Sequence, residues 1–156
     1  MTVFSNAIKD DFEPLLKLIV NFELDKQVSF DKSDKLDARK LLKENRKNLK
    51  KFITDKNCKY ILCRQDGILN GYIFLSYDDN IYVGEGYINE VYVVPTQRRK
   101  GIAKRLLQKG LIWLKQRNCK TIDITVNKKN KPAIELYKHF GFDKFDDNYI
   151  SMRKKG

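Results

Sequence analysis

Cysteine and histidine are scarce in this sequence, and their scarcity excludes several kinds of site. The chain of 156 residues has three cysteines, Cys58, Cys63 and Cys119, and one histidine, His139. No Cys-x-x-Cys pair occurs, so a structural zinc site would lack ligands and we expect no metal. An odd number of widely spaced cysteines indicates reduced thiols rather than a disulfide framework, which favours a cytoplasmic location.

The chain also lacks long apolar runs. No stretch approaches the roughly 18 consecutive apolar residues that a membrane-spanning helix needs, and we expect no membrane association. The N-terminus has no basic segment followed by an apolar one, so no signal peptide is expected. The length fits one domain over residues 1–156, and a chain of this size needs no disulfide to stabilise its core.

Basic residues are in excess, and they are concentrated in the second half of the chain. The formal net charge is +12; residues 1–86 hold 15 Lys and Arg against 14 Asp and Glu, whereas residues 87–156 hold 17 against 6. Residues 96–120 include nine basic side chains and no acidic one. Such a field attracts an anion, which could be a nucleic acid, an acidic surface or a phosphorylated cofactor. Charge alone does not choose among these three.

The spacing of apolar residues predicts an α/β fold. Periodicity places helices over residues 12–20, 34–53, 101–117 and 132–140, and strands over residues 3–8, 59–63, 68–77, 81–94, 121–126 and 149–152. This order predicts a single mixed sheet, mostly antiparallel, flanked by helices.

Short polar and glycine-containing segments predict how these elements begin and end. Ser33 or Asp34 can cap the second helix. The pair at Asp66 and Gly67 is typical of a tight hairpin turn. Two glycines, Gly84 and Gly86, indicate a break or a bulge in the strand that contains them.

A basic turn before the third helix has the features of a phosphate-binding site. Residues 91–105 read VYVVPTQRRKGIAKR, so a strand, a turn and a helix N-terminus follow one another directly. The first N–H groups of a helix have no acceptor within it, and the helix dipole adds partial positive charge there. Gly101 and Ala103 let an anion approach this backbone. Positive side chains are supplied by Arg98, Arg99, Lys100, Lys104 and Arg105.

This turn resembles the coenzyme A pyrophosphate loop of the GNAT superfamily of N-acetyltransferases. The resemblance is carried by Arg98-x-x-Gly101-x-Ala103 after a strand that ends in Val-Val-Pro. A second segment, Asn-x-x-Ala-x-x-Leu-Tyr-x-x-x-Gly-Phe at residues 130–142, is similar to the family's second cofactor-binding segment. The resemblance implies the acyl-CoA N-acyltransferase fold, with acetyl-CoA as co-substrate and an amine as acceptor.

The resemblance also assigns roles to individual residues. The main chain of Val91, Tyr92 and Val93 would hold the pantetheine arm and the thioester. Asn130 would contact the pantetheine region, and Tyr137 would lie near the sulfur. The pyrophosphate would be held by the backbone amides of Arg99, Lys100, Gly101, Ile102, Ala103 and Lys104. Two parallel strands, ending near Val94 and Val126, would diverge around the thioester.

The chemistry of acetyl transfer is consistent with these roles. An alkyl amine with a pKa of about 10 must lose a proton before it attacks a thioester, and Glu90 is our candidate base. The main-chain donors of an irregular strand can stabilise the oxyanion, and the Tyr137 hydroxyl can give a proton to the leaving thiolate. Structural roles are the alternatives: a core ring for Tyr137, a solvated strand position for Glu90 and a helix cap for Asn130.

Several readings of the function stay open at this point. We favour an N-acetyltransferase acting on a small-molecule amine, such as a polyamine or an aminoglycoside-like compound, because a charge of +12 would repel a basic peptide. A protein or peptide N-acetyltransferase is the first alternative. A basic nucleic-acid-binding module and a non-catalytic acyl-CoA sensor are the others, although no nucleic-acid motif occurs. An edge strand near the C-terminus could pair in a homodimer.

Overall fold

The computed structural model describes residues 1–30, 37–78 and 84–144. Contacts within the chain define two compact units, Met1–Thr125 and Val126–Gly156. The assignment of 1–156 to one N-acetyltransferase domain therefore stays a prediction. Among the described residues, no helix has the length and apolar character required to cross a membrane.

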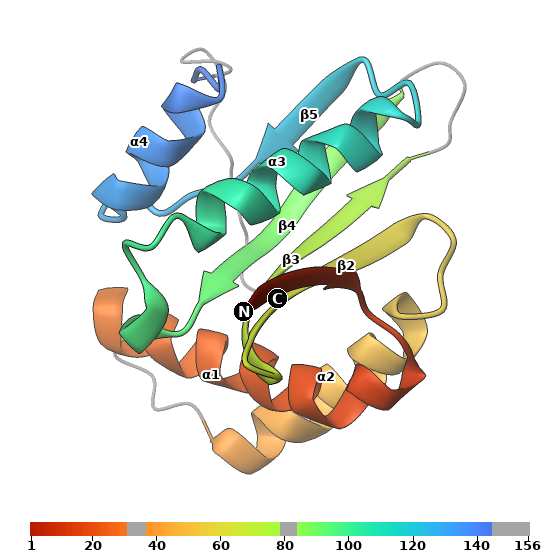
Figure 1. The fold of residues 1–156 in the computed structure, drawn as a ribbon, viewed down its shortest axis with the longest axis vertical. Coiled ribbons are helices and arrows are strands. Elements are labelled where there is room, and N and C mark those ends of the chain that lie inside the picture. Colours follow the sequence, from red (N-terminus) through yellow and green to blue (C-terminus); the bar gives the residue numbers. More distant parts are fainter. Residues whose placement is uncertain (31–36, 79–83, 145–156) are drawn as a thin grey trace, which may run out of the picture. The chain divides into compact units, whose positions relative to one another are not determined.

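A five-stranded sheet forms the centre of the first unit, with its strands in sequence order (Figure 1). The pairs are antiparallel except for the last two strands, which are parallel, so the prediction of a mixed, mostly antiparallel sheet is confirmed. The strands are β1 (Thr2–Asn6), β2 (Cys58–Gln65), β3 (Ile68–Tyr77), β4 (Glu85–Val93) and β5 (Thr121–Ile124). The strand expected at 149–152, and the dimer contact proposed for it, lie outside the described residues.

The β2–β3 hairpin closes at the turn that the sequence predicted. Asp66 and Gly67 both have positive φ angles, 51° and 83°. Two successive left-handed residues match the right-handed twist of the flanking strands, which is why short polar residues and glycine are favoured here.

Two helices cover one face of the sheet, α1 (Phe12–Phe30) and α2 (Ala38–Phe52) (Figure 1). Helix α1 continues well past residue 20, where apolar periodicity placed its end. The predicted cap of α2 at Ser33 or Asp34 is wrong, because Asp37 is the N-cap and accepts a hydrogen bond from the N–H of Arg39. Between these helices and the sheet lies a core of Leu15, Leu16, Leu18, Ile19, Leu49, Tyr60, Leu62, Tyr72, Phe74 and Tyr92.

Helix α3 (Ile102–Lys115) covers the opposite face (Figure 1). Its buried side includes Leu106, Leu107 and Leu114, all with 0% exposure. Gly110 allows close approach to β3, since a Cβ atom there would lie 2.9 Å from Cδ1 of Ile73. The basic turn therefore leads into a helix that is firmly fixed to the sheet.

The second unit contains α4 (Lys131–His139), whose ends lie within one residue of the predicted range 132–140. The side chain of Asn130 caps the helix by accepting a hydrogen bond of 3.3 Å from the N–H of Ala133. Gly141, with a φ angle of 83°, follows the last turn. The cap role foreseen for Asn130 is confirmed, and its contact with a cofactor stays a prediction.

Candidate active site

Strand β4 carries a bulge at Asn89. Phe74 of β3 lies opposite Glu90, while the next residue, Leu75, lies opposite Ile88. One additional residue is therefore inserted into β4, which bends and twists a strand locally. Glu90 follows directly after this irregularity, and the residues expected to hold the thioester come next.

The sequence placed this irregularity at Gly84 or Gly86, and for Gly86 the prediction is wrong. Gly84 has a positive φ of 57° and immediately precedes the strand, whereas Gly86 lies in regular pairing with both neighbours. Gly86 is needed for packing instead, because a Cβ atom there would lie 3.0 Å from Cδ2 of Leu114 and 3.1 Å from Sγ of Cys119.

The pairing of β4 with β5 ends at the same place. Its last pair joins Ile88 to Ile124, where β5 ends. Residues 89–93 therefore have no β5 partner, so their main-chain groups on that side are not used in a β4–β5 ladder. The resemblance implied that these two parallel strands diverge near Val94 and Val126; their pairing ends earlier, at Ile88 and Ile124, and a thioester between them stays a prediction.

Glu90 is held by a tyrosine from the neighbouring strand. The hydroxyl of Tyr72 donates a hydrogen bond of 2.6 Å to Oε2 of Glu90. Burial raises the pKa of the Glu90 carboxyl above its usual value; the bond from Tyr72 and the charge of Lys26 lower it, and the nearby charge of Glu23 raises it. A carboxylate with a raised pKa is a better base near neutral pH.

The aromatic surroundings of Glu90 account for this burial. Tyr60, Phe74 and Glu90 occupy one row across β2, β3 and β4. The rings of Tyr60 and Phe74 stack with their centres 4.3 Å apart, and Tyr60 and Tyr72 are 5% and 0% exposed. The structural alternative for Glu90, a solvated strand residue, does not describe this half-buried and hydrogen-bonded carboxyl.

The basic turn has the backbone geometry of an anion site. After a short 3-10 turn at Pro95–Gln97, Arg99 and Gly101 adopt left-handed φ angles of 64° and 76°. Alternation of this kind turns successive N–H groups toward one side. No hydrogen bond joins the backbone N–H groups of residues 99–104 to another described residue. These donors precede Arg105, whose N–H makes the first intrahelical bond, to the carbonyl of Gly101.

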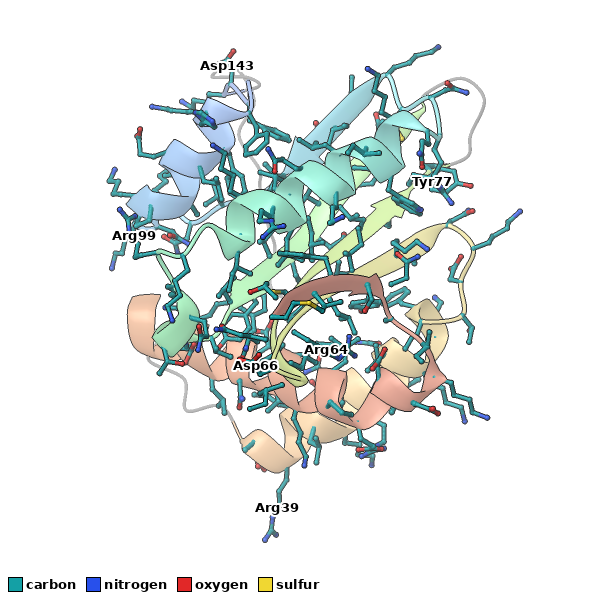
Figure 2. All side chains as sticks on the ribbon, viewed as in Figure 1. Arg39, Arg64, Asp66, Tyr77, Arg99 and Asp143 are labelled. Atoms are coloured by element: carbon teal, nitrogen blue, oxygen red, sulfur yellow. The ribbon has the colours of Figure 1, made fainter. Side chains whose placement is uncertain are left out.

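The side chains of the turn leave this backbone accessible. A Cβ atom at Gly101 would meet nothing within 4 Å. Arg99 is exposed and extends outward from the turn between β4 and α3 (Figure 2). Lys100 and Lys104 are also exposed, whereas the Ile102 side chain is buried, so Ile102 offers only its N–H group.

Arg98, the first residue of the motif, points its side chain at protein groups. Its Nε donates to the carbonyl of Val93 at 2.9 Å, and one Nη lies 3.1 Å from Oδ2 of Asp25. The hydroxyl of Tyr92 donates to the same oxygen of Asp25 at 2.6 Å. Sequence reasoning missed Asp25 because apolar periodicity ended the first helix at residue 20, before Asp25. Its signal was the spacing from Leu18 through Phe22, which continues the inner face of α1.

Tyr137 lies in the second unit and is 9% exposed. Its ring meets that of Phe142 edge to face, with centres 6.1 Å apart. Burial raises the pKa of its hydroxyl to about 12, so the group is protonated at neutral pH. Its hydroxyl makes no hydrogen bond to a described side chain or backbone group. His139 on the same helix is exposed.

The cysteines do not have the character of nucleophiles. Cys63 is buried, and Cys58 and Cys119 are half-buried. Burial raises the pKa of all three thiols, that of Cys58 to about 11, so each is protonated near neutral pH.

Comparison with known proteins agrees with this geometry. The profile of the acetyltransferase (GNAT) family matches residues 23–142, which is well over half of the chain. An uncharacterised N-acetyltransferase of Methanocaldococcus jannaschii is 38% identical over 56 residues. That match covers 36% of this chain and 25% of the archaeal protein, so the chain corresponds to only a part of it.

Solved structures of similar fold align over nearly the whole length of the chain. A predicted acetyltransferase from Clostridium acetobutylicum, crystallised with acetyl-CoA, has a TM-score of 0.79 at 20% identity, covering 98% of this chain and 96% of its own. An aminoglycoside N-acetyltransferase in complex with CoA has a TM-score of 0.72 at 15% identity, covering 100% and 96%. At these identities the likeness shows the fold, and the family is shown by the profile match. The chain belongs to the acetyltransferase (GNAT) family.

Proposed function

We propose that this protein transfers the acetyl group of acetyl-CoA to a primary amine, with a small-molecule amine as the favoured acceptor. One observation carries the proposal: a half-buried carboxylate, Glu90, lies at the bulge of β4 and on the same strand as Val91, Tyr92 and Val93. The N–H groups of residues 99–104 follow this strand after the short 3-10 turn at Pro95–Gln97. A base, a thioester-binding strand and a phosphate-binding turn are thus consecutive in the chain.

The base acts first. Glu90 takes a proton from the protonated amine, directly or through a water molecule, and the neutral nitrogen attacks the carbonyl carbon of the thioester. Because the pKa of Glu90 is raised by burial, the proton transfer from an amine is less unfavourable than to an exposed carboxylate. The charge of Glu23 acts on Glu90 more strongly than the opposing charge of Lys26, so the local balance favours a cationic acceptor on this side of the strand.

The attack forms a C–N bond and an oxyanion on the former carbonyl. The donors that we assign to this charge are main-chain N–H groups of residues 89–93, which pair with β3 on one side and have no β5 partner on the other. When the tetrahedral intermediate collapses, the C–S bond breaks, the thiolate of CoA leaves, and the nitrogen loses its second proton to solvent to give the neutral amide. Tyr137 supplies a proton or a hydrogen bond to that sulfur, a role that rests on its position in the second motif.

Binding of the cofactor rests on the turn. The backbone amides of Arg99, Lys100, Gly101, Ile102, Ala103 and Lys104 hold the pyrophosphate at the start of α3, where the helix dipole adds to the exposed cations. Asn130 contacts the pantetheine arm. The structures of similar fold solved with acetyl-CoA and with CoA support this assignment.

The choice of a small amine follows from the distribution of charge. A net charge of +12 disfavours the approach of a lysine-rich peptide, while a small amine feels mainly the local carboxylates. The aminoglycoside N-acetyltransferase of similar fold supports an amine of this class without identifying it.

Calorimetric titration with acetyl-CoA, followed by a thiol-release assay, tests the proposal. Saturable one-to-one binding is expected, with CoA released when one of a set of amines is present; spermidine, neamine and a peptide with a free N-terminus make a suitable set. Turnover with the peptide alone would move the acceptor class to protein N-termini. Cofactor binding without turnover on any broad set of amines would favour an acyl-CoA sensor. Salt-sensitive binding of DNA with no cofactor binding would overturn the proposal.

A further inference from the structure

The contacts of Arg98 connect three parts of the first unit. Its guanidinium bonds to Val93 at the end of β4 and to Asp25 on α1, and it lies 5.7 Å from the centre of the Tyr92 ring. Asp25 receives both the Tyr92 hydroxyl and an N–H of Arg98 on one oxygen. Arg98, which begins the phosphate-binding turn, is therefore bonded to α1, whereas α3 covers the opposite face of the sheet.

These contacts hold the guanidinium of Arg98 on the α1 side of β4. The Tyr92 side chain belongs to the core beneath α1 and α2, and is 5% exposed. Helix α3, whose N-terminus carries the unbonded amides, covers the other face of the sheet. A guanidinium held over Tyr92 by Nε and one Nη contacts the α1 face, and its planar fork fits two acceptors at once in a way that lysine cannot reproduce.

We infer that Arg98 is a positioning residue rather than a phosphate ligand: together with Asp25 it fixes the end of β4, and so the main chain of Val93, against α1. The inference rests on the proposed function, because Val93 is one of the residues assigned to the pantetheine arm. Arg98 donates a hydrogen bond to the carbonyl of Val93. An arginine from the following turn therefore sets the register in which β4 meets the cofactor. The same bonds anchor the part of α1 that carries Glu23 and Lys26, whose charges act on Glu90.

The direction in which Asp25→Asn changes the affinity for acetyl-CoA distinguishes a positioning role from a purely electrostatic one. Asp25→Asn removes a negative charge from the neighbourhood of the turn, so simple electrostatics predicts unchanged or tighter binding of the anionic cofactor. Loss of the anchor predicts weaker binding of acetyl-CoA, by about three- to tenfold, the size expected for the loss of one typical hydrogen bond. Glu13→Gln is the matched control, since Glu13 is on the same helix and pairs with Arg46. This control should leave the affinity unchanged.

A comparison of two ligands, acetyl-CoA and ADP, gives a second test of the positioning role. ADP carries the pyrophosphate without the pantetheine arm. In Arg98→Gln we expect acetyl-CoA to bind about three- to tenfold more weakly, while the affinity for ADP stays within about twofold of the wild type. Arg98→Lys, which keeps the charge, should behave like Arg98→Gln because it cannot make both bonds. The double variant Asp25→Asn/Arg98→Gln should be no weaker than either single variant.

Calorimetric titration of these variants with acetyl-CoA and with ADP, each first shown to be folded by its thermal melting curve, gives a clear decision. Unchanged or tighter acetyl-CoA binding by Asp25→Asn, wild-type affinity in Arg98→Lys, or a parallel loss of ADP affinity in Arg98→Gln would each overturn the inference. If Asp25→Asn does not fold, the Arg98 variants decide alone. Failure of the wild type to bind acetyl-CoA would instead remove the proposed function on which the inference stands.

Discussion

The hydroxyl of Tyr72 lies 2.6 Å from Oε2 of Glu90, and this bond joins the aromatic core of the first unit to the carboxylate at the β4 bulge. Tyr72 has 0% exposure, and burial raises the pKa of its hydroxyl well above its usual value of 10. The tyrosine therefore stays protonated, and a donor, near neutral pH. It stabilises the charged form of Glu90, while burial opposes that form.

Replacing Glu90 with glutamine should remove the base while keeping the size of the side chain. We expect kcat/KM to fall by about 10²–10⁴-fold. In the wild type the rate falls as pH drops through the Glu90 pKa, because the base must be unprotonated; that acidic limb lies above pH 4.5, since burial raises the pKa. The pH profile of Glu90→Gln should lack this limb. Glu85→Gln, which changes a carboxylate on the same strand that accepts a bond from Tyr87, should keep it.

Tyr72→Phe should move the acidic limb toward neutral pH. The Tyr72 hydroxyl lowers the pKa of Glu90, so its removal leaves burial as the dominant influence and the carboxylate holds its proton to a higher pH. Activity at pH 6 should thus fall more than activity at pH 8. Tyr87→Phe is the control, because that hydroxyl bonds to Glu85 instead. An equal loss at both pH values would mean that Tyr72 serves packing alone.

Much of the fold was predictable because it depends on local patterns. Turn chemistry located the hairpin at Asp66 and Gly67, and Pro132 and Gly141 bounded α4. The errors arise where tertiary contacts decide. Gly86 looks like a bulge residue in the sequence, yet it is glycine because Leu114 and Cys119 pack against it. The true bulge, at Asn89, carries an ordinary polar residue, and no local signal marks it.

The site shows the same division. The motif indicated the turn and Glu90 as candidate site residues, since both are contiguous with the strand, and their roles stay predictions. It could not show that Arg98 faces Asp25, because residue 25 is far away in sequence and looked like part of a loop. Tyr72 was missed as a partner for Glu90 for a similar reason: the register between β3 and β4 sets this contact, and the bulge shifts that register.

Gly101→Val should weaken acetyl-CoA binding by at least about tenfold. The φ angle of 76° disfavours a β-branched residue, and the new side chain would fill open space at the turn that we assign to the pyrophosphate. Gly67→Val is a matched control for strain, since Gly67 also has a positive φ, of 83°, and open space around it. It should lose stability without losing cofactor affinity. If folded Gly101→Val and Gly67→Val bound acetyl-CoA with equal affinity, the assignment of the basic turn to the pyrophosphate would be contradicted.

Gly71→Ala should destabilise the first unit. A Cβ atom at this position would lie 2.8 Å from the carbonyl oxygen of Tyr92, a backbone atom that cannot rotate away. We expect the free energy of unfolding to drop by about 1–3 kcal/mol, as in other overpacked sites. Chemical denaturation measures this drop. A variant as stable as the wild type would show that β4 can move away from β3 near its end at no cost.

Tyr137→Phe should slow turnover while leaving cofactor affinity nearly unchanged. Phenylalanine keeps the ring that meets Phe142 and removes only the hydroxyl, so the fold of the second unit is preserved. Loss of the donor leaves the departing thiolate without its proton, and we expect kcat to fall by about 10²-fold or more. Steady-state kinetics and calorimetric titration with acetyl-CoA measure the two quantities separately.

The pH dependence of the same variant examines its protonation state. A donor is lost when it ionises, and burial raises the pKa of Tyr137 to about 12, so its basic limb should lie above the range in which the enzyme is assayed. An ordinary tyrosine would ionise at about pH 10, whereas the wild-type rate should not fall as the pH rises to that value. A basic limb near pH 9 that disappears in Tyr137→Phe would keep the acid role and contradict the burial of its hydroxyl. Full activity in the variant would remove Tyr137 from the chemistry and leave it as a core residue of α4.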